Sequence, residues 1–169
     1  MQAAEQEDQD RLERMMRLHG DALVRMCYLY LHDFALAQDA AQETFVKAWR
    51  RMGDFRGACS ERTWLMRVAI NTCRDIHRTA WMRHVDRGTT LDSLPEAGAE
   101  DAHPDGEVLK AVMALPRRER EAVLLRYYQE MTLEEAAQAL GISQSAVKQR
   151  LQRANRRLRE RLKEWYEDA

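Results

Sequence analysis

The feature that most constrains the fold is the stretch 131–161, which reads as two helices joined by a tight turn. Thr132 and Glu135 form the Thr-x-x-Glu pattern of a capping box, whose side chains satisfy free backbone N–H groups at a helix start. Gly141 follows where a helix commonly ends in a left-handed residue, and Ser143 is suited to cap the next helix. The pattern therefore predicts a helix-turn-helix.

The second helix of this unit has a divided surface. Its apolar seam consists of Val147, Leu151, Ala154, Leu158 and Leu162. The remaining surface is basic, with Lys148, Arg150, Arg153, Arg156, Arg157, Arg159, Arg161 and Lys163 against Glu160 alone. A solvated basic helix in a bundle is one interpretation. The capping box, the glycine and the short turn favour the other, in which this helix meets base edges and phosphates.

Composition points to a globular all-α chain. The 169 residues allow one ordinary domain or two small ones. Only 3 prolines and 7 glycines accompany 45% hydrophobic and 33% charged residues. The net charge of −1 conceals a segregation that favours a nucleic-acid partner, because the N-terminus and 92–107 are acidic whereas 148–163 is basic.

The cysteines and the hydropathy indicate a cytoplasmic protein. Cys27, Cys59 and Cys73 are odd in number and lack C-x-x-C spacing, which argues against a disulfide framework or a zinc site. They are suited to fill a core, and redox sensing by one of them is the alternative. No apolar run is long enough to span a bilayer, and the acidic start is unlike a signal peptide. We expect no metal and no cofactor.

The N-terminal part predicts three helices, over 10–31, 34–52 and 61–81, which enclose one small core. His32 and Asp33 form a short break after the first helix. The second helix places Trp49 on its apolar face, together with Leu36, Ala40, Ala41, Phe45 and Ala48. A different face of this helix shows Asp39, Gln42, Glu43 and Lys47, and by pattern alone that face is solvated.

The loop 53–60 and the helix after it carry residues suited to nucleic acid. Phe55 and Arg56 lie between two glycines, where the aromatic ring can stack on an unpaired base or pin the loop to the core. Ser60 is suited to cap the third helix. Trp64 can pack inside or stack on a base. One stripe of this helix, suited to a phosphate backbone, is formed by Arg67, Asn71, Arg74 and Arg78.

Residues 84–106 read as a flexible acidic linker between an N-terminal domain, 1–83, and a C-terminal domain, 107–169. The acidic linker is either solvated or a strand of carboxylates that imitates nucleic acid in a basic channel. Helices are expected over 108–115 and 117–130, with Pro116 in the first turn of the second. That helix is expected to bury Ala122, Val123, Leu125 and Tyr128.

Three segments resemble consecutive signatures of one protein family. They are DAAQETFVKAW, FRGACSERTWLMRVAINTCRDIHR and ALPRREREAVLLRYYQEMTLEEAAQALGISQSAVKQRLQRANRRLRERL. In order and spacing they are similar to the extracytoplasmic-function sigma factors of bacterial RNA polymerase, over about 10–80 and 107–165. The resemblance implies two helical domains that bind polymerase and promoter DNA.

The resemblance also implies a role for particular residues. The β′ clamp helices of core RNA polymerase would be bound by Asp39, Gln42 and Glu43. The melted −10 strand would be held by Phe55, Arg56, Trp64, Arg67, Asn71 and Arg74. The C-terminal domain would dock on the β flap and contact the −35 element through Ser145, Lys148, Gln149, Gln152, Arg153 and Arg156. The linker would run through the RNA exit path, and an anti-sigma factor would cover the apolar polymerase-binding surfaces of the unbound protein.

Two other classes of function fit the sequence less well. A two-domain DNA-binding regulator would use the same helix-turn-helix, but has no need of the face formed by Asp39, Gln42 and Glu43. An enzyme is disfavoured because the sequence holds no phosphate loop, metal-ligand spacing or nucleophile–base motif, so no small-molecule substrate is expected. Cys59 maps to no role in the family pattern.

Overall fold

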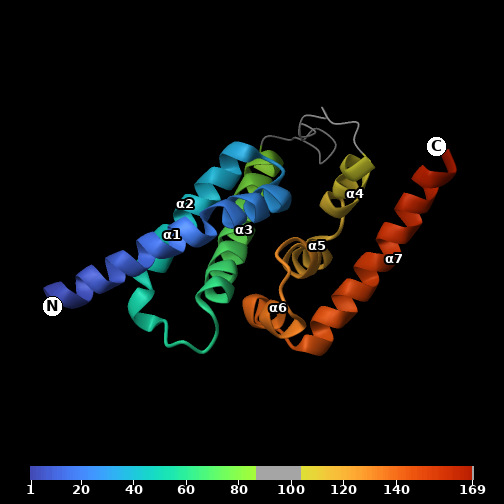
Figure 1. Cartoon of the computed structure of the whole chain (residues 1–169). Coiled ribbons are helices and arrows are strands. Elements are labelled where there is room, and N and C mark those ends of the chain that lie inside the picture. The colour runs from blue at the N-terminus through green and yellow to red at the C-terminus, as the bar shows by residue number, and fades with distance from the viewer. Residues whose placement is uncertain (87–103, 169) are drawn as a thin grey trace. The chain divides into compact units, whose positions relative to one another are not determined.

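A computed structural model describes residues 1–86 and 104–168, which contain helices and no strand (Figure 1). The chain divides into two compact units, Met1–Met82 and Arg83–Ala169. Each unit has its own set of fully buried apolar side chains. The predicted all-α class is therefore confirmed.

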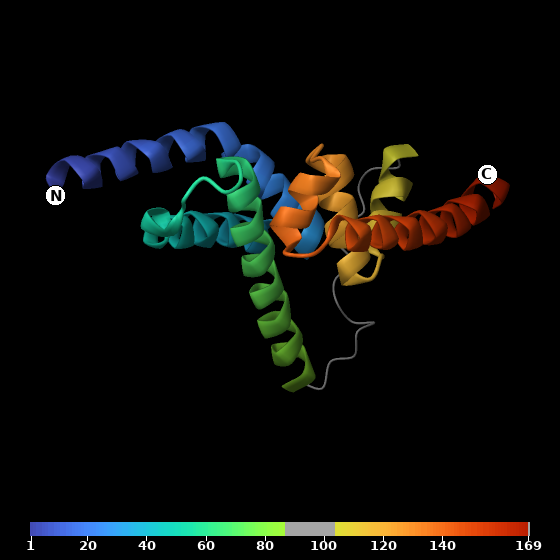
Figure 2. The same cartoon turned by 90° about the horizontal axis from the view of Figure 1, so that it is seen from below.

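The first unit consists of α1 (Gln2–Leu31), α2 (Phe34–Arg50), the short 3-10 helix η1 (Met52–Asp54) and most of α3 (Glu61–Asp86). The prediction that the first helix begins near residue 10 was wrong. The early residues lack an apolar stripe but are good helix formers, and hydrogen bonds one turn apart join Gln6 to Asp10 and Gln9 to Glu13. Figures 1 and 2 show this part of α1 projecting as a single helix beyond α2.

The predicted break between the first two helices is confirmed. His32 is left-handed, with φ 60°, and its backbone N–H donates to the Tyr28 carbonyl at 2.9 Å. The Asp33 carboxylate then caps α2 by accepting from the Leu36 N–H at 2.9 Å. These two contacts end one helix and begin the next, so α1 and α2 can fold back on each other.

The core of the first unit differs from the prediction at Trp49. The buried stripe of α2 is centred on Ala37, Ala41, Thr44 and Ala48, which leaves Phe45 at its edge and Trp49 beyond it, with the indole 43% exposed. Thr44 is buried at little cost because its hydroxyl donates to the Ala40 carbonyl at 2.7 Å. The other helices contribute large buried side chains, namely Met15, Leu23, Met26, Tyr30, Leu65, Met66 and Ile70.

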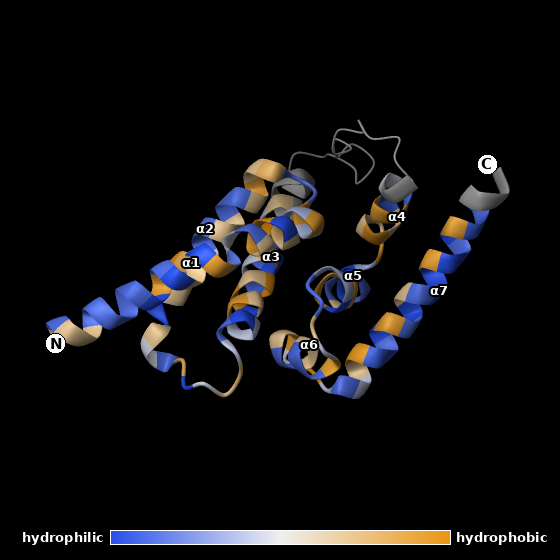
Figure 3. Cartoon of the chain, in the orientation of Figure 1, coloured by the Kyte–Doolittle hydropathy of each residue, from blue (hydrophilic) through white to orange (hydrophobic). Residues whose placement is uncertain are grey.

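The second unit contains α4 (Pro104–Met113), α5 (Arg117–Val123), the π-helix η3 (Leu124–Tyr128), α6 (Leu133–Leu140) and α7 (Gln144–Asp168). In Figure 1, α4, α5 and α6 lie along one side of α7. Figure 3 shows apolar residues recurring along α7 between hydrophilic ones. As predicted, Val147, Leu151 and Ala154 are buried, whereas Leu158 and Leu162 are half-buried.

The helix predicted over 117–130 is interrupted by η3. Here the Gln129 backbone N–H donates to the Leu124 carbonyl, five residues earlier, at 3.0 Å. The wider turn shifts the register, so Leu124 is buried. Tyr128, predicted to face inward, is instead 40% exposed. Pro116 precedes the first helical residue rather than occupying it.

The predicted linker, 84–106, falls mainly outside the described residues, which omit 87–103. At its two ends, α3 continues through Asp86 and α4 begins at Pro104. Among the described helices, none combines the length and apolar character that a bilayer crossing requires.

Candidate nucleic-acid and protein interfaces

The outer face of α2 is acidic and partly apolar. Asp39, Gln42 and Glu43 are exposed and lie three and four residues apart, on one side of the helix. Val46 and Trp49 continue this side at helical spacing and are 37% and 43% exposed. Carboxylates repel a phosphate backbone, while exposed apolar side chains favour contact with protein. The outer face of α2, defined by these five residues, therefore suits a protein partner.

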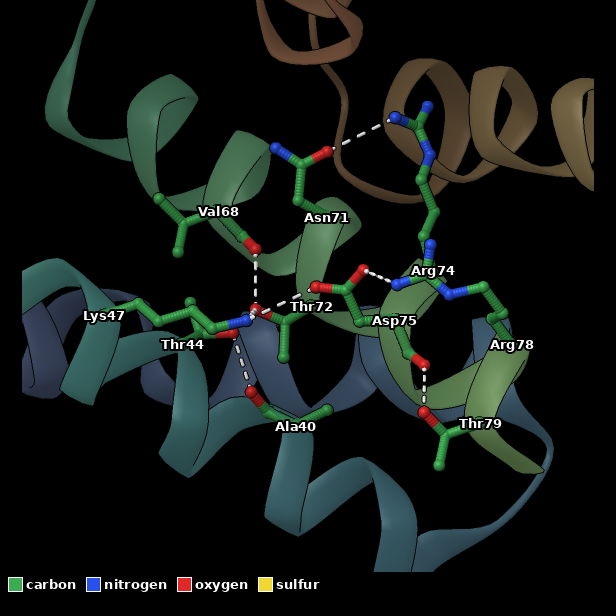
Figure 4. Close-up of polar contacts among 10 residues, drawn as sticks. All are labelled: Ala40, Thr44, Lys47, Val68, Asn71, Thr72, Arg74, Asp75, Arg78 and Thr79. Carbon is green, nitrogen blue, oxygen red and sulfur yellow. Dashed lines mark hydrogen bonds and ion pairs between the residues drawn. The ribbon is translucent and has the colours of Figure 1, made fainter. Parts of the chain in front are cut away.

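Lys47, which the pattern placed with the acidic residues, joins α2 to α3 instead. Its ammonium donates to the Thr72 hydroxyl at 3.2 Å and lies 3.7 Å from an Asp75 carboxylate oxygen (Figure 4). The Thr72 hydroxyl in turn donates to the Val68 carbonyl at 2.8 Å. The ammonium of Lys47 therefore pairs with groups of α3 and does not neutralise the carboxylates on the outer face of α2.

The predicted stripe on α3 is present, but its charges are unequally placed. Arg67 and Asn71 are exposed, and Arg74 donates to the Asn71 side-chain oxygen at 3.3 Å (Figure 4). Arg78 forms an ion pair with Asp75 at 3.0 Å. Because Asp75 compensates Arg78, the positive charge of the stripe is concentrated nearer the start of α3, at Arg67 and Arg74.

The loop before α3 is anchored by its aromatic residue. The Phe55 ring lies 4.9 Å from the Trp64 ring, centroid to centroid, at an angle of 35°. Both side chains are half-buried, whereas Arg56 is exposed and Gly57 turns the chain with φ 75°. Of the two interpretations of Phe55 and Trp64, this arrangement favours packing in the unbound protein. Arg56 is left at the surface beside them.

The contacts at the start of α3 also confirm its predicted cap. The Ser60 hydroxyl oxygen accepts from the Thr63 backbone N–H at 3.1 Å and donates to the Thr63 hydroxyl at 2.9 Å.

The predicted helix-turn-helix geometry is confirmed. The Thr132 hydroxyl accepts from the Glu135 N–H at 3.1 Å at the start of α6. Gly141 ends α6 in the left-handed region, with φ 67° and its N–H bonded to the Ala137 carbonyl. The Ser143 hydroxyl caps α7 by accepting from the Ala146 N–H at 3.1 Å. These caps fix where α7 begins, and hence which of its residues form its leading turns.

The leading turns of α7 carry an exposed polar surface. Its members recur at spacings of three and four residues, so they share one side of the helix, opposite the buried seam. We call this surface the α7 edge, and it consists of Ser145, Lys148, Gln149, Gln152, Arg153 and Arg156. Donors and acceptors of these types suit the edges of bases and the phosphates beside them.

Arg157, in the same basic run, has a structural contact that the sequence did not suggest. Its guanidinium forms an ion pair at 3.0 Å with Glu119 of α5, whose carboxylate is buried. A buried carboxylate needs such a partner, since an unpaired buried charge is costly. Arg157 therefore fixes α7 against α5, and part of the basic run serves the fold.

The described residues hold no group of three or more His, Cys, Asp or Glu side chains arranged for a metal ion. Cys27 and Cys73 are buried and Cys59 is half-buried, and all three are thiols.

Comparison with known proteins assigns each unit to a described region. Residues 15–83 match the family model "Sigma-70 region 2", and residues 105–158 match "Sigma-70, region 4". The RNA polymerase sigma-E factor of Streptomyces avermitilis is 34% identical over 155 residues, covering 89% of this chain and 84% of that protein.

Two further relatives extend the comparison. The ECF RNA polymerase sigma factor SigW of Bacillus subtilis is 28% identical over 171 residues, covering 93% of this chain and 91% of that protein. Among solved structures, the sigma factor RpoE, crystallised with the anti-sigma factor NepR from Bartonella quintana, is similar with a TM-score of 0.75 at 25% identity. That match covers 89% of this chain and 96% of the other.

Proposed function

Because the chain belongs to the extracytoplasmic-function group of the sigma-70 family of bacterial RNA polymerase sigma factors, we propose that three of its surfaces divide promoter-dependent initiation between them. A sigma factor is not an enzyme. It binds core RNA polymerase and directs it to promoters through the −35 and −10 elements. Of the three surfaces, the exposed α7 edge, on a helix whose start is fixed by the Ser143 cap, gives the strongest support.

The outer face of α2 is the proposed site for the β′ clamp helices of core polymerase. Its carboxylates, Asp39 and Glu43, can form ion pairs with basic side chains of a partner, and Gln42 can hydrogen-bond between them. The exposed Val46 and Trp49 supply the apolar area that a stable protein interface needs at its centre.

The melted −10 strand is assigned to the loop before α3 and to the stripe of α3. Arg67 and Arg74 are suited to phosphates, and Asn71 lies between them to hydrogen-bond a base or sugar. The aromatic pair Phe55 and Trp64 offers a surface on which an unpaired base can stack. Arg56 completes this set at the exposed part of the loop.

The α7 edge is the proposed reader of the −35 element in the major groove. Lys148 and Arg153 can donate to guanine O6 and N7, and Gln149 or Gln152 can pair with adenine. Ser145 and Arg156 are suited to contact the phosphate backbone. The same unit exposes the apolar side chains Val108, Tyr127 and Tyr128, which support docking of this unit on the β flap.

The complex of a structurally similar sigma factor with an anti-sigma factor supports regulation of this chain by such a partner. RpoE, which this chain resembles in structure, is bound by the anti-sigma factor NepR. We infer a corresponding partner here, one that covers the outer face of α2 until a signal releases it, and a cytoplasmic location where the polymerase works. Exposed Trp49 is the natural centre of such an interface.

Reconstitution with core polymerase tests the proposal. We expect the purified chain to confer initiation on a subset of a promoter library. Glu43→Lys should abolish co-purification with core polymerase while the helical circular dichroism signal is kept, since it reverses a charge on the outer face of α2. Asp21→Lys, at an exposed position of α1, is the matched control and should co-purify normally.

Two results would contradict the proposal. One is a folded wild-type chain that starts no promoter-dependent transcript with bacterial core polymerase. The other is a Glu43→Lys variant that binds polymerase as well as Asp21→Lys does.

A further inference from the structure

Arg11 of α1 contacts both ends of the loop that precedes α3. Its Nε lies 2.8 Å from a carboxylate oxygen of Glu61, the first residue of α3. Its Cζ lies 4.7 Å from the centroid of the Phe55 ring, just after η1. The side chain is 29% exposed, so these contacts are partly shielded from water. One guanidinium thus bridges the two points where the loop leaves and rejoins the helices.

The loop has an anchor of its own at each of these points. Phe55 packs on Trp64, and the Ser60 hydroxyl caps α3. Between them lies the loop tip, residues 56–59, which is exposed except for the half-buried Cys59. Gly57 in the tip has φ 75°, and because glycine lacks a β-carbon the tip can adopt other conformations unless the two ends of the loop are fixed. A cation over an aromatic face and a charge-assisted hydrogen bond are contacts able to fix them.

We infer that Arg11 is a positioning residue for recognition of the −10 strand. It holds Phe55 and the start of α3 together, so that the loop tip and Arg56 are presented in one conformation. A loop already ordered loses less conformational entropy when it binds, which raises affinity without a direct contact. This inference rests on the proposed function, which assigns the −10 strand to this loop.

The bridging residue lies outside the shared family segment. The match to Sigma-70 region 2 begins at residue 15, whereas Arg11 belongs to the earlier part of α1. That part of the helix contacts the start of α3 through Arg11 and Arg14, and contacts Phe55 through Arg11. The extension of α1 thereby gains a role that the family match alone does not assign.

Arg14 provides a matched control on the same helix. Its guanidinium also pairs with Glu61, at 3.3 Å, and in the described part of the chain it has no ring contact. The substitution Arg14→Ala therefore removes the same charge and one contact to the same carboxylate, but leaves the Phe55 anchor in place. A difference between Arg11→Ala and Arg14→Ala isolates the bridge across the loop.

The first measurement is tryptic cleavage after Arg56 in the unbound protein, followed by mass spectrometry. Cleavage requires local opening of the loop, so its rate reports how firmly the tip is held. We expect Arg11→Ala to be cut after Arg56 several-fold faster than the wild type, and Arg14→Ala to match the wild type. Circular dichroism should show equal helix content in all three.

The second measurement is the affinity of each reconstituted holoenzyme for a single-stranded −10 oligonucleotide. Arg11→Ala should weaken binding about three- to tenfold, as expected for loss of one part-exposed cation–π contact and its ion pair. Arg11→Lys should recover part of the loss, because an ammonium can pair with Glu61 and lie over Phe55. Affinity for a −35 duplex should be unchanged in all variants.

Equal behaviour of Arg11→Ala and Arg14→Ala would overturn the inference. So would faster cleavage of Arg11→Ala without weaker strand binding, because the contact would then be only structural. A wild-type holoenzyme that does not bind the −10 strand would instead overturn the proposed function, while the cleavage comparison would still report on the loop.

Discussion

At the scale of single residues, His19 makes the stability of the first unit depend on pH. It lies half-buried on α1, and burial lowers its pKa below the ordinary 6.5. The charge of Arg62 lowers this pKa further, while Glu61 opposes the change. The folded protein therefore binds this proton less readily than the unfolded chain, so stability falls as the pH drops below about 6.5 and is fully retained above it.

Urea unfolding between pH 5 and pH 8 measures this effect. His19→Gln should flatten the loss of unfolding free energy of the first unit below about pH 6.5, because glutamine does not titrate. Leu18→Gln, at an exposed position of the same helix, introduces the same side chain without removing a titrating group, and as the control it should keep the wild-type pH profile. An unchanged profile in His19→Gln would contradict the assignment.

Residue roles were predictable from the sequence where a short side chain acts on its own backbone, and not where a long side chain chooses between partners. The caps at Ser60, Thr132 and Ser143 follow from local chemistry and are confirmed. The pattern placed Lys47 on a solvated face and Arg157 in a basic run suited to nucleic acid, yet Lys47 contacts Thr72 and Arg157 pairs with Glu119. Those partners lie far along the chain, so spacing carries no information about them.

At the scale of elements, two glycines should respond to alanine with opposite sign. Gly141 ends α6 in the left-handed region, at φ 67°, where a β-carbon costs about 1–2 kcal/mol. Gly20 lies within α1, where an added β-carbon would meet nothing within 4 Å. Alanine there should stabilise the first unit by about 0.5–1 kcal/mol, because it restricts the unfolded chain.

Chemical denaturation of Gly141→Ala and Gly20→Ala, followed by circular dichroism, measures both effects. We expect Gly141→Ala to destabilise the second unit. Gly20→Ala should stabilise the first unit. Since both substitutions add one methyl group, a difference in sign reports the backbone conformation at each position and not the added group. Two changes of the same sign would contradict this account of the two backbone conformations.

The elements that were not predicted are those in which apolar residues do not recur at helical spacing. The early part of α1 is polar on all sides, so hydropathy does not mark it, although its residues favour a helix. The π-helix η3 inserts one residue into a turn, and the resulting exposure of Tyr128 depends on how α5 packs against its neighbours. Patterns of 3.6 residues cannot register such an insertion.

At the scale of the whole molecule, segregated charge lets a chain of net charge −1 act on DNA. The early part of α1 and the outer face of α2 are acidic, whereas the α7 edge is basic. Attraction to phosphates depends on the local potential rather than on the total charge. The order of the two units was predicted from the resemblance of three sequence segments to one family, and the matches over 15–83 and 105–158 confirm it, while contacts between residues far apart in the sequence were not predicted.

The separate cores of the two units lead to a prediction about fragments. Since α3 continues through Asp86, a fragment of residues 1–86 retains all three helices and the buried side chains of the first unit. We expect it to unfold cooperatively and to co-purify with core polymerase through the outer face of α2, with no affinity for a −35 duplex. Glu43→Lys within the fragment should abolish co-purification and leave unfolding unchanged.

An unfolded fragment would show that the second unit is required for the first to fold. A folded fragment that fails to bind polymerase would move the principal polymerase contact to the second unit.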